Sequence, residues 1–152
     1  MVASFDPPCE KERCCMSRPD AATEAARWLR YAREDLAAAE AVTRRESVAA
    51  RHVCWLAQQA AEKTIKAALV FLQIDVPRTH DLDALRNLLP DEWQRAGGRT
   101  DLAALTEWAV EARYPGEWPD ATAADASSAL ETARQVLAAV ANDLGAHGFA
   151  EG

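Results

Sequence analysis

The C-terminal part of the chain carries an apolar pattern that fits a helix and no other regular structure. Between residues 126 and 144 the apolar side chains recur in steps of four and three, which keeps them on one side of an α-helix. Such a stripe is typical of a helix packed along a near-antiparallel neighbour. No segment of the chain alternates Val, Ile or Thr with polar residues as a strand would. The stripe consists of Ala126, Leu130, Ala133, Leu137, Val140 and Leu144.

Three further long segments and one short one show helical spacing. Thr23 is expected to cap the first long helix, and Gly145 is expected to end the last. A short helix is expected to begin at Thr79 or Asp81 and to end at Pro90. The sequence therefore predicts an all-α, up-and-down four-helix bundle with one additional short helix. The long helices are expected over residues 22–44, 47–73, 101–113 and 121–145.

The composition narrows the classes of function. The formal net charge is −7, so no global positive field attracts nucleic acid, and RNA or DNA binding would need a local basic patch. No apolar run approaches the ~20 residues that span a bilayer, so no membrane association is expected. The N-terminus lacks a basic start followed by an apolar stretch, which argues against a signal peptide. We expect a cytoplasmic protein.

The chain is expected to form one domain with a tail at each end. Residues 1–20 are predicted to be a flexible tail, and Met16 is a candidate natural start because the first helix follows it closely. The helical bundle is expected over residues 21–146. Residues 147–152 are predicted to be a C-terminal tail.

The four cysteines do not form a metal-binding pattern. Cys54 lies within a helical segment and is expected to be a small buried residue. The other three cysteines lie in a segment without hydrophobic periodicity, and no two of them form a C-x-x-C pair. Two of them are adjacent and cannot easily bind one metal ion together. These residues are Cys9, Cys14 and Cys15. No metal site and no cofactor are predicted.

A cluster of polar residues stands out within the second long helix, in the stretch "AQQAAEKTIKAALV" (57–70). The rest of this helix is apolar nearly all round, which favours burial against more than one neighbour. The cluster is either an ordinary solvated face or a polar interface or ligand cleft in an apolar wall, and helical spacing alone leaves both alternatives open. Its members are Gln58, Gln59, Glu62, Lys63 and Lys66.

Four segments resemble the HEPN domain of prokaryotes, over about residues 22–145. They are "AREDLAAAEAV" (32–42), "CWLAQQAAEKTIKAALVFLQ" (54–73), "THDLDAL" (79–85) and "ARYPG" (112–116), in this order. The resemblance implies a short α-helical bundle that usually dimerises. Many members of that family are metal-independent ribonucleases, often toxins. Others lack the catalytic residues and are proposed to bind nucleotides or to act with minimal nucleotidyltransferases.

The motif of the ribonuclease branch is incomplete in this chain. That motif is an Arg, four to six residues and a His, near the start of the last long helix. Here the Arg is Arg113, but the positions open to the His hold Trp118, Pro119 and Asp120. The pair Arg45 and His52 has the spacing, but it joins the first two helices and is expected by chance. No catalytic residue is therefore assigned, and the sequence favours a protein that is not an enzyme.

The resulting hypothesis is a HEPN binding module without ribonuclease activity. The resemblance implies a homodimer that binds a nucleotide or phosphate ligand, acts with a nucleotidyltransferase-type protein, or does both, in a toxin–antitoxin-like or defence context. Lysine and arginine side chains would meet the phosphate charge, with polar neighbours to orient them. The candidate ligand-binding residues are Gln59, Glu62, Lys63, Lys66, His80, Arg113 and Tyr114.

Two alternatives remain. One is a metal-independent ribonuclease toxin that uses a displaced histidine, His52 or His80. The other is a homodimeric interaction protein with no ligand, in which the polar cluster of the second helix lies at the two-fold axis.

Overall fold

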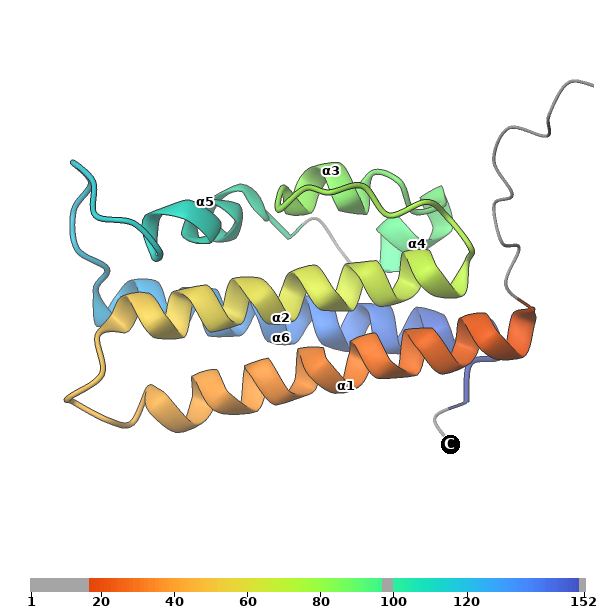
Figure 1. Cartoon of the computed structure of the whole chain (residues 1–152), viewed down its shortest axis with the longest axis horizontal. Coiled ribbons are helices and arrows are strands. Elements are labelled where there is room, and N and C mark those ends of the chain that lie inside the picture. The colour runs from red at the N-terminus through yellow and green to blue at the C-terminus, as the bar shows by residue number, and fades with distance from the viewer. Residues whose placement is uncertain (1–16, 97–99, 151–152) are drawn as a thin grey trace, which may run out of the picture.

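The computed structural model describes residues 17–96 and 100–150, and this part of the chain forms helices and no strand. The prediction of an all-α bundle is confirmed. Three of the helices are long and three are short (Figure 1). In chain order they are α1 (Arg18–Val42), α2 (Ala50–Phe71), α3 (Leu82–Arg86), α4 (Asp91–Ala96), α5 (Ala103–Glu111) and α6 (Ala123–Ala146).

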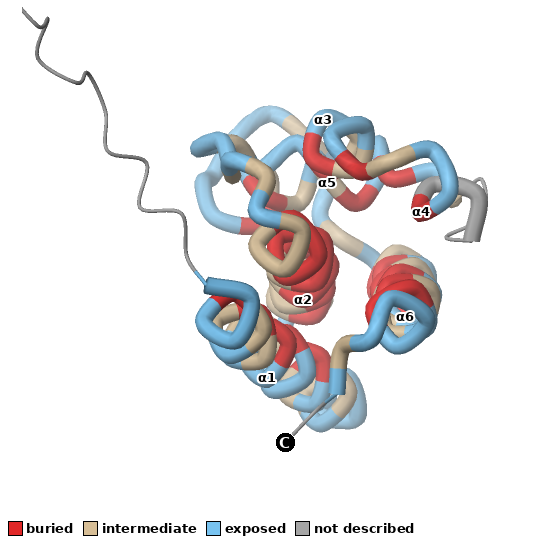
Figure 2. The backbone as a smooth tube through the Cα atoms, turned by 90° about the vertical axis from the view of Figure 1, so that its right-hand side faces the viewer, coloured by how far each residue is buried: buried red, intermediate tan, exposed pale blue. Residues whose placement is uncertain are grey.

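The central element is α2. It packs against α1, α3, α5 and α6, so neighbours surround it on most sides (Figure 2). Every residue from Thr64 to Leu69 is buried as a result. The apolar circumference of this helix in the sequence therefore has a simple cause, and the burial predicted from it is confirmed.

The ends of α1 differ from the prediction. Ser17 rather than Thr23 caps the helix, because the Ser17 hydroxyl oxygen accepts a hydrogen bond from the Asp20 amide. Thr23 lies one turn inside, where its hydroxyl donates to the carbonyl of Pro19. The helix begins at Arg18, before the bundle boundary expected from the sequence.

The helix α4 was not predicted. Pro90 was expected only to end a helix, but the short helix α3 already ends at Arg86 and Pro90 directly precedes α4. The carbonyl of Pro90 accepts the Trp93 amide at 2.9 Å, and a proline at this place loses nothing because its missing N–H would have no helical partner. The Trp93 side chain, 2% exposed, packs α4 onto the core.

The last helix ends at a different glycine from the one expected. Gly145 lies inside α6, whereas Gly148 adopts φ +85° and donates its amide to the carbonyl of Gly145. The amide of Phe149 donates to the carbonyl of Leu144 at 2.9 Å, which completes a Schellman motif. The Phe149 ring then meets Phe71 edge-on, with centroids 5.6 Å apart. The chain thus still contacts the bundle beyond residue 146.

Candidate functional site

The polar cluster on α2 is organised around the carboxylate of Glu62. Lys66 Nζ donates to Oε1 at 2.7 Å, and Gln58 Nε2 donates to Oε2 at 2.9 Å. The Nδ1 atom of His80, from the segment that joins α2 to α3, lies 2.9 Å from Oε2. Glu62 and Lys66 are only 5% and 9% exposed, and Gln58 is fully buried. These four residues are called the Glu62 network below.

The Glu62 network keeps its carboxylate ionised. Burial alone would raise the pKa of Glu62, but the hydrogen bonds from Lys66, Gln58 and His80 outweigh burial and lower this pKa. An ionised carboxylate can only accept hydrogen bonds, so the Nδ1 atom of His80 must carry the proton in this contact. The contact with Glu62 leaves the other ring nitrogen of His80, Nε2, uncommitted to it, on a side chain that is 56% exposed.

The same network fixes the segment between α2 and α3. Gln58 Nε2 also approaches the backbone carbonyl of His80, at 3.4 Å. Two residues later the amide of Leu82 donates to the hydroxyl oxygen of Thr106 at 3.1 Å, which links the start of α3 to α5. The Glu62 network therefore holds the segment just before α3 against α2, and the Leu82–Thr106 hydrogen bond ties the start of α3 to α5.

The two remaining polar residues of the cluster are also engaged within the chain. Lys63 forms an ion pair with Asp35 of α1, and Gln59 Nε2 donates to Gln58 Oε1 at 2.7 Å. Because the central members are buried and all five bond to protein groups, the solvated-face alternative is excluded. The ligand-site prediction for this cluster stays a prediction, now with the constraint that each lysine already has a carboxylate partner.

Arg113 and Tyr114 lie apart from this network, in the segment between α5 and α6. The Arg113 guanidinium carbon stands 5.3 Å from the centroid of the Tyr114 ring, and both side chains are exposed. The structure thus divides the seven predicted ligand residues into two groups. Gln59, Glu62, Lys63, Lys66 and His80 form or adjoin the Glu62 network, while Arg113 and Tyr114 border a pocket.

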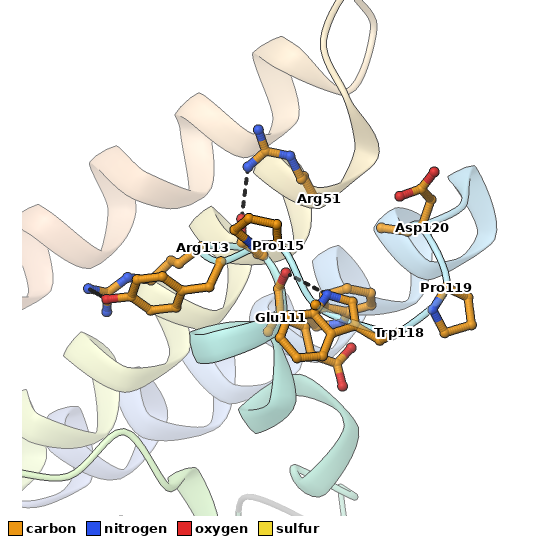
Figure 3. Close-up of a pocket in the computed structure, with 12 residues that line it drawn as sticks. Arg51, Glu111, Arg113, Pro115, Trp118, Pro119 and Asp120 are labelled. Carbon is orange, nitrogen blue, oxygen red and sulfur yellow. Dashed lines mark hydrogen bonds between the residues drawn. The ribbon is translucent and has the colours of Figure 1, made fainter.

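This pocket, called the α5–α6 pocket below, has a volume of about 330 Å³ (Figure 3). Arg51, at the start of α2, donates from Nη1 to the carbonyl of Ala112 at 2.8 Å and so fixes the end of α5. Trp118 Nε1 donates to the carbonyl of Glu111 at 3.1 Å. The Trp118 ring lies against Gly116 so closely that a Cβ there would stand 2.4 Å from it. Only glycine fits under this indole.

Sequence reasoning missed two of the pocket residues. Arg51 acts through a backbone carbonyl 61 residues away, which no local spacing reveals. Trp118 was noted only as a position without histidine, although the sequence "GEW" between two prolines was an available signal of a compact aromatic turn. Trp118, Pro119 and Asp120, the positions open to the histidine of the ribonuclease motif, all line the pocket.

Other candidate residues do not gather into a reactive site. His52 is half-buried and has no side-chain hydrogen bond to another residue of the described ranges 17–96 and 100–150. Cys54 is buried as predicted, and burial followed by the charge of Asp125 raises the pKa of its thiol to about 12. Cys9, Cys14 and Cys15 lie outside the described residues. Within the described residues no three His, Cys, Asp or Glu side chains are placed to hold a metal ion.

Comparison with known proteins identifies the family to which this helical bundle belongs. The family model of the HEPN domain matches residues 25–144, and the chain belongs to this family. Its structure is similar to that of TT1696 from Thermus thermophilus, with TM-score 0.64, 27% identity, 80% of this chain and 98% of that chain covered. It also shares its fold with ST0689, an archaeal HEPN homologue, with TM-score 0.58 and 24% identity over 79% of this chain and 97% of that chain. No curated protein matches the sequence.

The described helices bear on the membrane question as well. None of them combines the length and the apolar character that crossing a bilayer requires.

Proposed function

We propose that this HEPN domain is a binding module that holds a nucleotide or another phosphate-bearing ligand in the α5–α6 pocket. The observation that carries the proposal is the lining of this pocket, which combines two arginines with the aromatic rings of Trp108, Tyr114 and Trp118. Its volume of about 330 Å³ lies within the range of small-molecule sites.

The chemistry of the lining supports this ligand class. A guanidinium matches phosphate oxygens in geometry and charge, and Arg113 is exposed at the border of the pocket. An indole face stacks on a nucleobase, and Trp118 is held in place by its own hydrogen bond. The carboxylates of Glu111 and Asp120 are acceptors for amino and hydroxyl groups of a base or ribose.

The lysines of α2 are the competing site. Lys66 is buried against Glu62, and Lys63 is paired with Asp35. A phosphate at either lysine would have to displace a carboxylate, and displacement from Glu62 would leave a buried charge without its main partner. For this reason we place the phosphate at the arginines and retain the lysines as the alternative in the test.

The test is thermal unfolding of the full chain with a panel of nucleoside mono-, di- and triphosphates. A ligand at about 100 times its dissociation constant adds about 2.7 kcal/mol to the free energy of unfolding. We expect a selective rise in the melting temperature that Arg113→Ala abolishes and that Arg134→Ala, on the exposed face of α6, leaves unchanged. Loss of the rise in Lys63→Ala with Lys66→Ala, but not in Arg113→Ala, would move the site to α2. No rise with any nucleotide would overturn the proposal.

The partners in this proposal rest on the HEPN family alone. We propose a cytoplasmic homodimer that acts with a nucleotidyltransferase-type protein in a toxin–antitoxin-like or defence context. Sedimentation velocity of the full chain measures the dimer. A single species of monomer mass, 16.6 kDa, at micromolar concentration would contradict it.

The second candidate is metal-independent ribonuclease activity through His80. The Glu62 carboxylate favours His80 over His52 in this role. It orients the His80 ring through Nδ1 and leaves Nε2 uncommitted to this contact, on an exposed side chain. Cleavage of RNA in a chelator should then disappear in His80→Asn, which keeps a donor toward Glu62, and persist in His52→Ala. Absence of cleavage by folded protein would remove this candidate.

A further inference from the structure

A second hollow lies beside the N-terminal part of α5. Both α5 and α6 pack on α2, and a groove of about 470 Å³ lies between them. Ala104 of α5 and Ala129 of α6 line it with small side chains, and the half-buried Trp108 forms part of its wall. Trp108 also lines the α5–α6 pocket, so the two hollows adjoin at this indole. We call the second one the α5–α6 groove.

The charges of the groove are of one sign. Asp101, Glu107 and Asp125 line it, and none of its described lining residues is Lys, Arg or His. This contrasts with the neighbouring pocket, where Arg51 and Arg113 balance two carboxylates. The side chains that line the groove therefore carry a net negative charge, which those of the pocket do not.

The carboxylates of the groove retain acceptor capacity. Glu107 is exposed and forms no hydrogen bond or ion pair within the described part of the chain. Asp101 uses Oδ1 for the amide of Ala103, and Asp125 uses Oδ2 for Thr122. No cation neutralises Asp125 within the described residues, and its charge reaches inward to Cys54, where it adds to burial in raising the thiol pKa. The hydroxyls of Ser128 and Thr132 on the α6 side add neutral acceptors and donors.

We propose that the α5–α6 groove binds an arginine-bearing segment of a partner protein. Guanidinium groups fit carboxylates with paired hydrogen bonds, and they stack on an indole such as Trp108 better than the compact ammonium of lysine does. The small side chains of Ala104 and Ala129 leave room for a peptide backbone or a helix edge. A nucleic acid strand would bring phosphates to three carboxylates, so it is the wrong occupant.

The test uses an acetylated and amidated alanine-based peptide with three arginines, titrated onto the full chain by calorimetry at a low and a threefold higher salt concentration. We expect saturable binding of one peptide per chain, weaker at the higher salt concentration. Asp101→Asn with Glu107→Gln should weaken it about tenfold, because each carboxylate contributes a few-fold. Ser128→Arg, which places a guanidinium in the groove from an exposed position, should abolish it.

The control is Glu131→Gln, which removes the same charge from α6 outside the groove lining and should change the affinity less than twofold. An equal loss in this control would show general attraction to an acidic protein and overturn the proposal, as would the absence of saturation. Equal affinity for the lysine version of the peptide would overturn the choice of arginine. Circular dichroism verifies each variant's fold. The substituted residues do not line the α5–α6 pocket, although Trp108 lines both hollows, so either result leaves the nucleotide proposal to its own test.

Discussion

The Glu62 network and the α5–α6 pocket treat their charged groups in opposite ways. In the network a buried carboxylate meets a lysine, an amide and an imidazole of its own chain, and its hydrogen bonds are made inside the fold. In the pocket Arg113 and Tyr114 are exposed and contact mainly each other. The polar cluster of α2, which stands out in the sequence, therefore makes its hydrogen bonds within the fold. Arg113 and Tyr114, which stand out less, face solvent.

The difference follows from where each group lies relative to the core. The charges of Glu62 and Lys66 are buried on α2, which packs against four helices, so they must be paired to be tolerated. A charge after α5 stands at the end of a short helix, where solvent satisfies it at little cost. Substitutions should thus lower stability in the network and change ligand affinity in the pocket.

The largest effect is expected from Glu62→Ala. Removal of the carboxylate leaves Lys66 and Gln58 buried without their partner and should lower the free energy of unfolding by about 3–5 kcal/mol. Urea denaturation measures this loss. Glu34→Ala removes an exposed ion pair with Arg30 and should change stability by less than about 1 kcal/mol. Equal losses in the two variants would mean that the network is not buried in solution.

Acid should weaken the Glu62 network. The folded state lowers the pKa of Glu62, so its contribution to stability is complete above the unfolded value near 4.5. This contribution is lost as the pH falls through the lower folded pKa. Between about pH 6 and pH 3 the wild type should therefore lose more stability than Glu62→Gln, which has no proton to bind at this position. Parallel pH curves for the two proteins would contradict this assignment.

Gly116→Ala sharpens the comparison from the side of the pocket. The added Cβ would stand 2.4 Å from the Trp118 ring, so this ring must move from the wall of the pocket. We expect a stability loss of about 1 kcal/mol, because the site is exposed, together with the loss of the nucleotide-induced rise in melting temperature. A variant that still binds nucleotide as tightly as the wild type would show that Trp118 is not part of the site.

The smallest expected effect lies at the end of α2, next to the segment that the network fixes. Gln73 adopts φ 57°, and the amide of Ile74 donates to the carbonyl of Leu69 at 2.9 Å, as in a Schellman motif. Glycine accepts this conformation without a Cβ penalty, so Gln73→Gly should stabilise the protein by about 0.5–1 kcal/mol. Gln73→Ala is the matched control and should not stabilise it. Stabilisation by both would indicate a cause other than backbone conformation.

The sequence predicts the parts of this fold that depend on repetition. The helical stripes predicted α1, α2, α5 and α6 to within a few residues, since each repeats its apolar side chains over two turns or more. They could not predict α4, because a helix of six residues is too short to repeat an apolar pattern. The packing of Trp93 against the core also depends on residues from other helices. Nor could they decide between the two meanings of the polar cluster, since burial of Glu62 depends on helices that close over α2 from distant parts of the chain.

The buried thiol on the central helix has a practical consequence for following the motions of the bundle. A thiol with a pKa of about 12 holds almost no thiolate near neutral pH, and Cys54 is shielded on α2 by its neighbours. An alkylating reagent therefore reacts with it only when the bundle opens. With the three N-terminal cysteines replaced by serine, the labelling rate of Cys54 measures how often the bundle opens around α2. A ligand that binds the folded protein lowers this rate, and the decrease measures the free energy by which the ligand stabilises the fold.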